Sequence, residues 1–156
     1  MIRAVVGIAL LLVACTPSGV VAAESDYVVL DGSQIQSMLR QCSRRVPPVG
    51  DGRWKPGAAD VARFEAALPV AVAPLVASTP RLKNAPEGYR RQYVGITAGG
   101  HRLIYGNFFP RSGFADAFKE WRSRPIVMCD GGADFFGAEF DVETGKIIHI
   151  AFNGSV

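Results

Sequence analysis

The C-terminal stretch from Cys129 to Gly154, CDGGADFFGAEFDVETGKIIHIAFNG, constrains the fold of this chain more than any other stretch. Its apolar side chains occupy alternate positions, first at Phe136, Ala138, Phe140 and Val142, and then at Ile148, Ile150 and Phe152. A period of two predicts half-buried strands, with Glu139 and Asp141 on the opposite face of the first one. Glu143-Thr144-Gly145 supplies a hairpin loop, in which Gly145 can adopt a positive φ. We therefore expect a pair of antiparallel strands here.

Composition bounds what surrounds this pair. The chain has 156 residues, of which 49% are hydrophobic and 20% charged, as in a single globular domain with a packed core. The formal net charge is only +3, and the basic residues are scattered along the sequence. This balance does not indicate a nucleic-acid partner.

Two helices are predicted in the first half. Ile35, Met38, Leu39 and Cys42 recur at helical spacing and predict a helix over 33–43, with Arg44-Arg45 at its C-terminal end. Val61, Phe64 and Leu68 form the apolar stripe of a second helix, which begins after Pro56-Gly57. Pro69 is expected to break or restart this helix, because proline lacks the backbone N–H.

The second half is predicted to be mostly strands. Tyr89 to Thr97 and Arg102 to Phe109 read as a hairpin around Gly99-Gly100. Ser112 is expected to cap a short helix with Phe114, Phe118 and Trp121 on one face, and residues 126–129 to enter the last strands.

This order of elements predicts the α+β class, with N-terminal helices packed on an antiparallel sheet of about five strands. A sheet wrapped around one N-terminal helix resembles cystatin-like folds. The analogy rests on the order of elements only, and fold by itself does not imply function.

The N-terminus reads as an export signal. A short positive start, Met1-Ile2-Arg3, precedes an apolar run from Ala4 to Ala14. Eleven residues are too few to span a bilayer, which takes about 20, but they suit the apolar region of a secretory signal peptide.

Leu12-Val13-Ala14-Cys15, at the end of this run, resembles the lipobox of bacterial lipoproteins. The resemblance implies cleavage before Cys15 and acylation of Cys15, hence a lipid anchor. Thr16 in the next position resembles outer-membrane sorting with the protein facing the periplasm. The predicted organisation is a signal peptide over 1–14, a lipidated tether over 15–25 and one domain over 26–156. The alternative is a soluble periplasmic protein cleaved after Ala23, before Glu24.

With Cys15 acylated, Cys42 and Cys129 remain as an even pair. Both are expected to look inward, and an exported protein would oxidise them to a disulfide. Two buried free thiols are the alternative. A metal site at this pair is not expected, because no histidine lies nearby to complete a ligand set.

Two groups of residues are candidate sites. Tyr89, Arg90, Arg91 and Tyr93 would give a basic, aromatic strand surface for an anionic partner, a carbohydrate or the membrane face, or else an ordinary solvated strand face. Asp130 and Asp134 flank a Gly-Gly turn, with Glu139 and Asp141 further along, so that carboxylate oxygens could hold a cation, or else the stretch is an ordinary hairpin turn. His101 lies at a turn, and His149 is expected on the solvent side of its strand.

The function expected from these features is a non-catalytic, envelope-anchored binding domain. Its partner would be a protein or an envelope polymer, in an inhibitor, immunity or assembly role, and no cofactor is expected. The alternative is a small metal-dependent or hydrolytic periplasmic enzyme that uses Asp130, Asp134 and a histidine.

Overall fold

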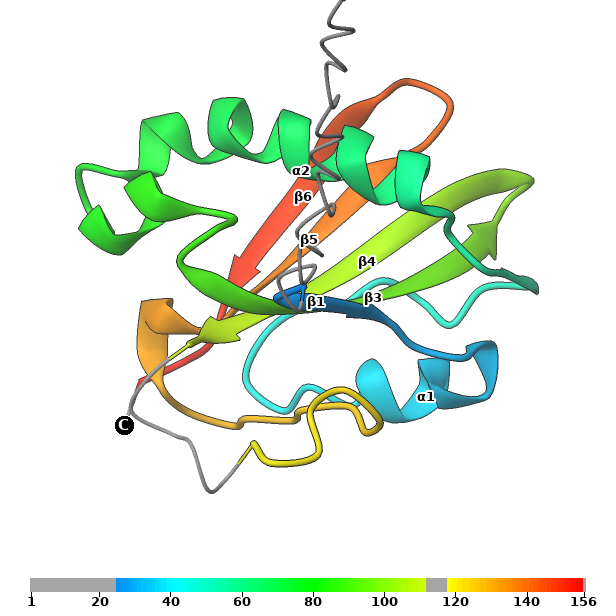
Figure 1. The fold of residues 1–156 in the computed structure, drawn as a ribbon, viewed down its shortest axis with the longest axis horizontal. Helices are drawn as coiled ribbons and strands as arrows, with labels where there is room; N and C mark the ends of the chain where they lie inside the picture. Colours follow the sequence, from blue (N-terminus) through cyan, green and yellow to red (C-terminus); the bar gives the residue numbers. More distant parts are fainter. Residues whose placement is uncertain (1–24, 112–117, 156) are drawn as a thin grey trace, which may run out of the picture.

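A computed structural model describes residues 25–111 and 118–155 (Figure 1). These residues form a mixed sheet of six strands with one long helix and one short helix, so the expected α+β class is confirmed. The strands are β1 (Tyr27–Val29), β2 (Gly52–Trp54), β3 (Tyr89–Ala98), β4 (His101–Pro110), β5 (Phe136–Asp141) and β6 (Lys146–Phe152). In the described part of the chain, no helix is long and apolar enough to cross a membrane.

The sheet follows the order β1-β3-β4-β5-β6, and β2 also pairs with β3. The two predicted hairpins, β3–β4 and β5–β6, are present and antiparallel. The expectation of a wholly antiparallel sheet is wrong, because β1 pairs with β3 in parallel. A long crossover through the first helices separates β1 from β3, and such a connection permits a parallel pair.

The helix α2 (Ala58–Val72) covers one face of the sheet (Figure 1). It runs through Pro69, so the predicted break is wrong. Pro69 itself is exposed, whereas Leu68 and Val72 on either side of it are buried in the core. Packing of these two side chains holds the last turn, although proline supplies no helical N–H there.

Three short 3-10 segments adjoin the two helices, one before α1 and two after α2. They are η1 (Gly32–Gln34), η2 (Ala73–Leu75) and η3 (Pro80–Asn84).

The aromatic core beneath α2 includes Phe64, Tyr93, Phe108 and Phe140. Phe64 stacks on Phe140 with ring centroids 5.4 Å apart, which fixes the helix above β5.

The opposite face is covered by α1 (Ile35–Met38) and by the segment 121–130 (Figure 1). Because α1 has only four residues, the predicted helix over 33–43 is much too long. The side-chain amide of Gln41 donates to the carbonyl oxygen of Met38, an acceptor that helix continuation would need. Beyond it the chain leaves the helical path and Arg44 turns into the interior.

Three further expectations need correction or lie outside the structure. Residues 126–129 are not a strand. Ser112 and Phe114 of the predicted short helix lie outside the described residues, and residues 118–123 form turns. A β-bulge shifts the β5–β6 register at Glu139/Phe140, so Ile147 faces the core side and Ile148 is 52% exposed, against the alternation expected from sequence.

Candidate functional site

A buried guanidinium lies between the sheet and the segment 121–130. Arg44 is 8% exposed and donates to the hydroxyl of Tyr105 (3.1 Å) and to the side-chain oxygens of Asn153 (2.7 Å) and Asn107 (2.5 Å). No carboxylate in the described part of the chain pairs with it. Burial lowers the pKa of Arg44, because the charged form loses hydration. The predicted role of Arg44 at a helix end is therefore wrong.

A strand was expected over 126–129, but this segment is held to the sheet by hydrogen bonds from side-chain amides instead of by strand pairing. Gln92 donates to the carbonyls of Trp121 (2.5 Å) and Arg124 (2.6 Å), and its side-chain oxygen accepts the N–H of Ile126 at 2.8 Å. Asn153 donates to the carbonyls of Met128 and Asp130. Because a buried backbone group needs a partner, these amides allow an irregular segment to cover the sheet.

The predicted disulfide between Cys42 and Cys129 is confirmed, with Cα atoms 4.9 Å apart. Both cysteines are exposed rather than inward-facing. The bond ties the stretch after α1 to the segment 121–130. It therefore links two of the segments that cover this face of the sheet.

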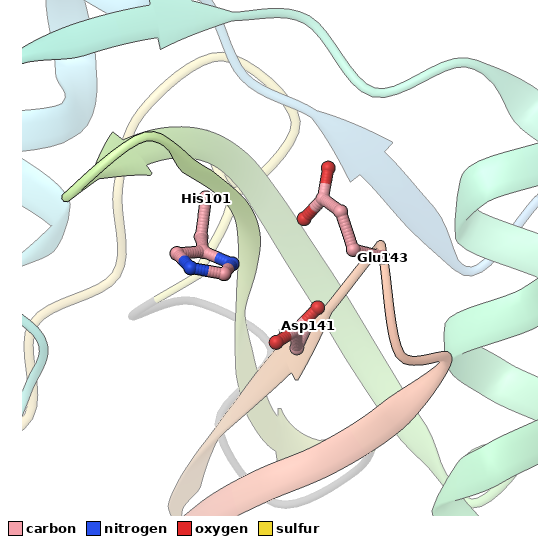
Figure 2. Close-up of side chains that lie close together, drawn as sticks. All are labelled: His101, Asp141 and Glu143. Atoms are coloured by element: carbon pink, nitrogen blue, oxygen red, sulfur yellow. The ribbon is translucent and has the colours of Figure 1, made fainter.

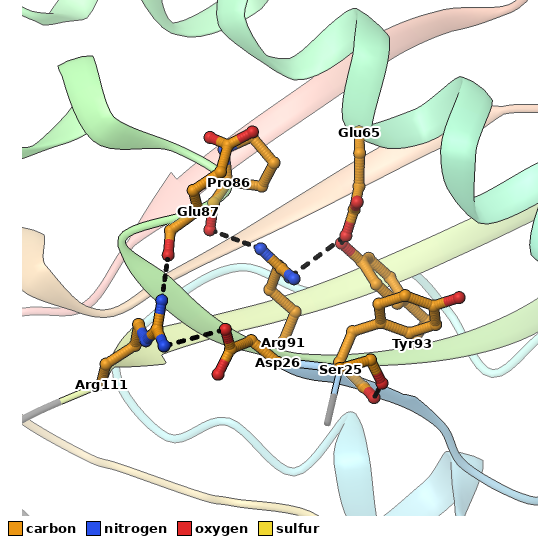
Figure 3. A network of polar contacts seen from close by, with 9 residues as sticks. Ser25, Asp26, Glu65, Pro86, Glu87, Arg91, Tyr93 and Arg111 are labelled. Atoms are coloured by element: carbon orange, nitrogen blue, oxygen red, sulfur yellow. Dashed lines mark hydrogen bonds and ion pairs between the residues drawn. The ribbon is translucent and has the colours of Figure 1, made fainter. Parts of the chain in front are cut away.

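The predicted basic, aromatic surface on β3 is not formed. Tyr89 and Tyr93 are fully buried and Arg91 is 7% exposed. Figure 3 shows Arg91 and the Tyr93 hydroxyl converging on the Glu65 carboxylate of α2, at 3.1 and 2.9 Å. Burial, followed by the Glu65 charge, raises the pKa of Tyr93. Arg90 lies over the ring of Trp121, in the segment that covers the other face of the sheet. The four residues therefore contact elements on both faces of the sheet and do not form one exposed surface.

The Gly-Gly acidic turn meets no histidine in the described part of the chain. Gly131 and Gly132 both have positive φ, and the turn continues as η4 (Gly132–Asp134) rather than as a hairpin. Asp134 pairs with Arg81 at 3.1 Å and Asp130 is exposed. Among the described residues, Asp130 and Asp134 belong to no group of three metal-ligating side chains.

His149 faces Glu139 across the β5–β6 pair. The expectation that His149 is on the solvent side is wrong, since it is half-buried and its Nε2 atom is buried without a hydrogen-bond partner among the described residues. Glu139 is 9% exposed. Burial raises the pKa of its carboxyl group, an effect opposed by His149 and Arg45.

His101, at the start of β4, lies beside two carboxylates that the sequence did not connect with it. Figure 2 shows the side chains of His101, Asp141 and Glu143 turned toward one another, and one ligand atom from each lies within 4.8 Å of the others. Asp141 ends β5 and Glu143 lies in the turn that follows. The sequence showed a turn before His101 and another after Asp141, but it did not indicate that the two turns meet. The pairing of β4 with β5 brings them together.

A groove runs between α2 and the end of the β5–β6 hairpin. It has a volume of about 410 Å³ and is lined by Ala67, Val70, Ala71, Gly145, Lys146 and Ile147. Val70 is 79% exposed. The strand β6 borders this groove at the edge of the sheet and, among the described residues, pairs only with β5. An open edge beside an apolar groove is a form of peptide-binding site.

Comparison with known proteins gives no relative from which a role can be transferred. No family model matches the chain, nor does any curated protein or solved structure. The resemblance to cystatin-like folds therefore still rests on element order alone, and the function must be argued from the residues of this chain.

Proposed function

We propose that this chain is an exported, lipid-anchored envelope protein whose domain, residues 26–156, binds an extended segment of a partner protein along β6. The observation that carries the proposal is the open edge of β6 beside the groove under α2. The activity is binding, without catalysis. Acylated Cys15 would hold the domain at the outer membrane, facing the periplasm.

The backbone of β6 offers the hydrogen bonds. The N–H of Asn153 donates to Phe135 on the β5 side, and the direction of N–H groups alternates along a strand. The N–H groups of Ile150 and Phe152 are therefore expected to point to the open edge. Edge strands are often protected by lysine and by bulges, but here Lys146 and the bulge both lie near the start of β6, which leaves its second half open.

The groove offers an anchoring position. Ala67, Val70 and Ala71 of α2 face Ile147 across it, and these four side chains carry no polar group. A strand added to β6 would direct alternate side chains to the helix side of the sheet, where α2 lies. One apolar side chain of the partner can fill the groove and remove Val70 from water, which favours binding through the hydrophobic effect.

The charges around the groove select an acidic partner. Lys146 lines the groove, and a Cβ added to Gly145 would lie 3.3 Å from the Arg63 guanidinium, so two cations flank this end. The nearby carboxylate of Glu143 is already paired with Arg102 at 3.0 Å. The occupant is therefore an extended peptide segment that combines an apolar anchor with an acidic residue beside it.

Site-specific photo-crosslinking in intact cells tests the site. A photoreactive residue in place of Val70 or Ile148 should give the same crosslinked product, whereas one in place of Val127, which is 43% exposed in the segment 121–130, should give none. Lys146→Glu should abolish the product, and Lys55→Glu, at an exposed lysine outside the groove, should retain it. Equal products from all three positions, or no effect of Lys146→Glu, would refute the proposed site.

The anchor is tested separately. The predicted signal and Cys15 lie outside the described residues, so their support is the sequence of residues 1–15 alone. Cys15→Ser should prevent incorporation of labelled fatty acid and release the protein from membranes. Continued labelling of this variant would show that Cys15 is not the acylated residue, whatever the domain binds.

A further inference from the structure

We propose that His101, Asp141 and Glu143 form a binding site for a divalent transition-metal ion of the zinc type. The site lies where the β3–β4 and β5–β6 turns meet. It is independent of the peptide-binding function proposed above, since neither the groove nor the β6 edge supplies a ligand.

The fold holds the three residues on two neighbouring hairpins. Gly99 and Gly100 have φ of 58° and 80° and turn the chain back so that His101 opens β4. Asp141 pairs with Leu103 of β4, and the N–H of Val142 donates to Arg102 at 3.0 Å. The ligand residues are therefore fixed at strand ends by the sheet's own hydrogen bonds.

The spacing of the ligand atoms suits a metal after a small closure. One atom from each residue lies within 4.8 Å of the other two. Ligand atoms around a tetrahedral zinc lie about 3.4 Å apart, from zinc–ligand distances near 2.1 Å, so even from the widest of these spacings each atom needs to move by only roughly 0.8 Å. His101 and Glu143 are exposed, so solvent and an ion can reach their side chains.

Hydrogen bonds already orient both carboxylates. Glu143 accepts from the backbone N–H and from Nε of Arg102, each at 3.0 Å. Asp141 accepts from the backbone N–H of Thr144 at 2.9 Å through Oδ1. Carboxylates that bind metals are commonly held by such outer partners.

The kinds of atoms narrow the metal. One imidazole nitrogen with two carboxylate oxygens suits zinc or a neighbouring transition ion, whereas calcium and magnesium prefer oxygen ligands only. Three protein ligands leave one tetrahedral position for water or for a group from a partner.

The test uses the mature chain and zinc chloride alone, followed by calorimetry and by NMR. Wild-type protein should bind one zinc ion per chain. His101→Ala should weaken binding by at least about tenfold, and Asp141→Asn should weaken it too. His149→Ala removes the other of the chain's two histidines and should bind zinc as the wild type does.

A measurement on the wild type makes the test independent of how the variants fold. Substoichiometric Mn²⁺ should broaden the amide signals of residues 101, 141 and 143 before any others. Absence of saturable zinc binding, equal affinity in His101→Ala, or broadening centred on His149 would each overturn the proposal.

Discussion

The guanidinium of Arg44 donates to the side-chain oxygen of Asn107 over 2.5 Å, in a layer where the two residues are only 8% and 2% exposed. The same guanidinium donates to Asn153 and Tyr105, so one cation binds neutral acceptors from the strand β4 and from the residue that follows β6. Because those acceptors also position the segment 121–130, this layer joins the covering segment to the sheet.

Replacing Arg44 should destabilise the fold strongly. Arg44→Met leaves the oxygens of Asn107 and Asn153 without their donor, at about 1–3 kcal/mol for each unsatisfied group. Relief of the buried charge offsets part of this cost, and we expect a net loss of about 2–4 kcal/mol in the free energy of unfolding. The matched control is Arg45→Met, since Arg45 is exposed. Urea unfolding that gives the same midpoint for both variants would contradict the role assigned to Arg44.

The Cys42–Cys129 bond should contribute substantially to stability. The two cysteines are 87 residues apart, and a loop of that length corresponds to about 4.6 kcal/mol in the chain-entropy model. The Cys42→Ser/Cys129→Ser double variant should unfold at a lower denaturant concentration than the oxidised wild type. Dithiothreitol should lower the wild-type midpoint to that of the variant and leave the variant unchanged, whereas an unaltered wild-type midpoint would contradict the prediction.

Glu139 should make stability fall as the pH rises. Burial raises the pKa of its carboxyl group, so the native state keeps a proton that the unfolded chain has already lost. Stability is therefore lost between the unfolded carboxyl pKa, about 4.3, and the higher native value. Glu139→Gln should remove this loss, and should match the wild type below the window and exceed it above.

A carboxylate with the opposite shift provides the control for this pH series. The backbone N–H of Ser33, bonded to the side chain of Asp31 at 2.9 Å, lowers the pKa of Asp31. Its contribution is present above the usual carboxyl pKa and is lost as the pH falls. Asp31→Ala should thus be less stable than the wild type near neutral pH and approach it in acid. Unfolding curves from pH 3 to 8, about the range that spans both windows, separate the two signs.

Gly137 should not tolerate a side chain. A Cβ at this position would lie 2.5 Å from the Tyr105 hydroxyl, the group that accepts from Arg44. We expect Gly137→Ala to push Tyr105 away and to cost about 1–3 kcal/mol, as in other overpacked sites. Gly154→Ala is the control, because its Cβ would meet its nearest neighbour at 3.5 Å, an ordinary contact. Similar thermal midpoints for the two variants would contradict the prediction.

The apolar pattern predicted much of the framework correctly. The strands β3, β4 and β5 were predicted to within a residue or so, β3 and β4 as a hairpin around Gly99-Gly100 and β5 from its period of two, because turn residues and alternation are local properties of the chain. The count of cysteines predicted the disulfide once Cys15 was assigned to the anchor. The stripe of α2 was recognised for the same local reason, but the continuation through Pro69 depended on burial of Val72 by the sheet.

Burial of the polar side chains was harder to predict. Gln92, Asn107 and Asn153 alternate with apolar residues, and the sequence alone does not distinguish a solvated face from one covered by a segment 30 residues away. Arg91 and Tyr93 were predicted to lie on a surface of the sheet, but both are buried, with Glu65 of α2 as their shared partner. The same reasoning explains His149, whose burial depends on what covers the second face of the sheet.

The sequence by itself thus determined the α+β class, both long hairpins, the main helix and the pairing of Cys42 with Cys129, since each follows from local periodicity or from a count. Only the tertiary structure decided which polar side chains are buried, and it alone brought His101 to Asp141 and placed β6 at an open edge beside α2. The physical reason is that these relationships depend on strand register and on packing between distant segments, which no local pattern encodes.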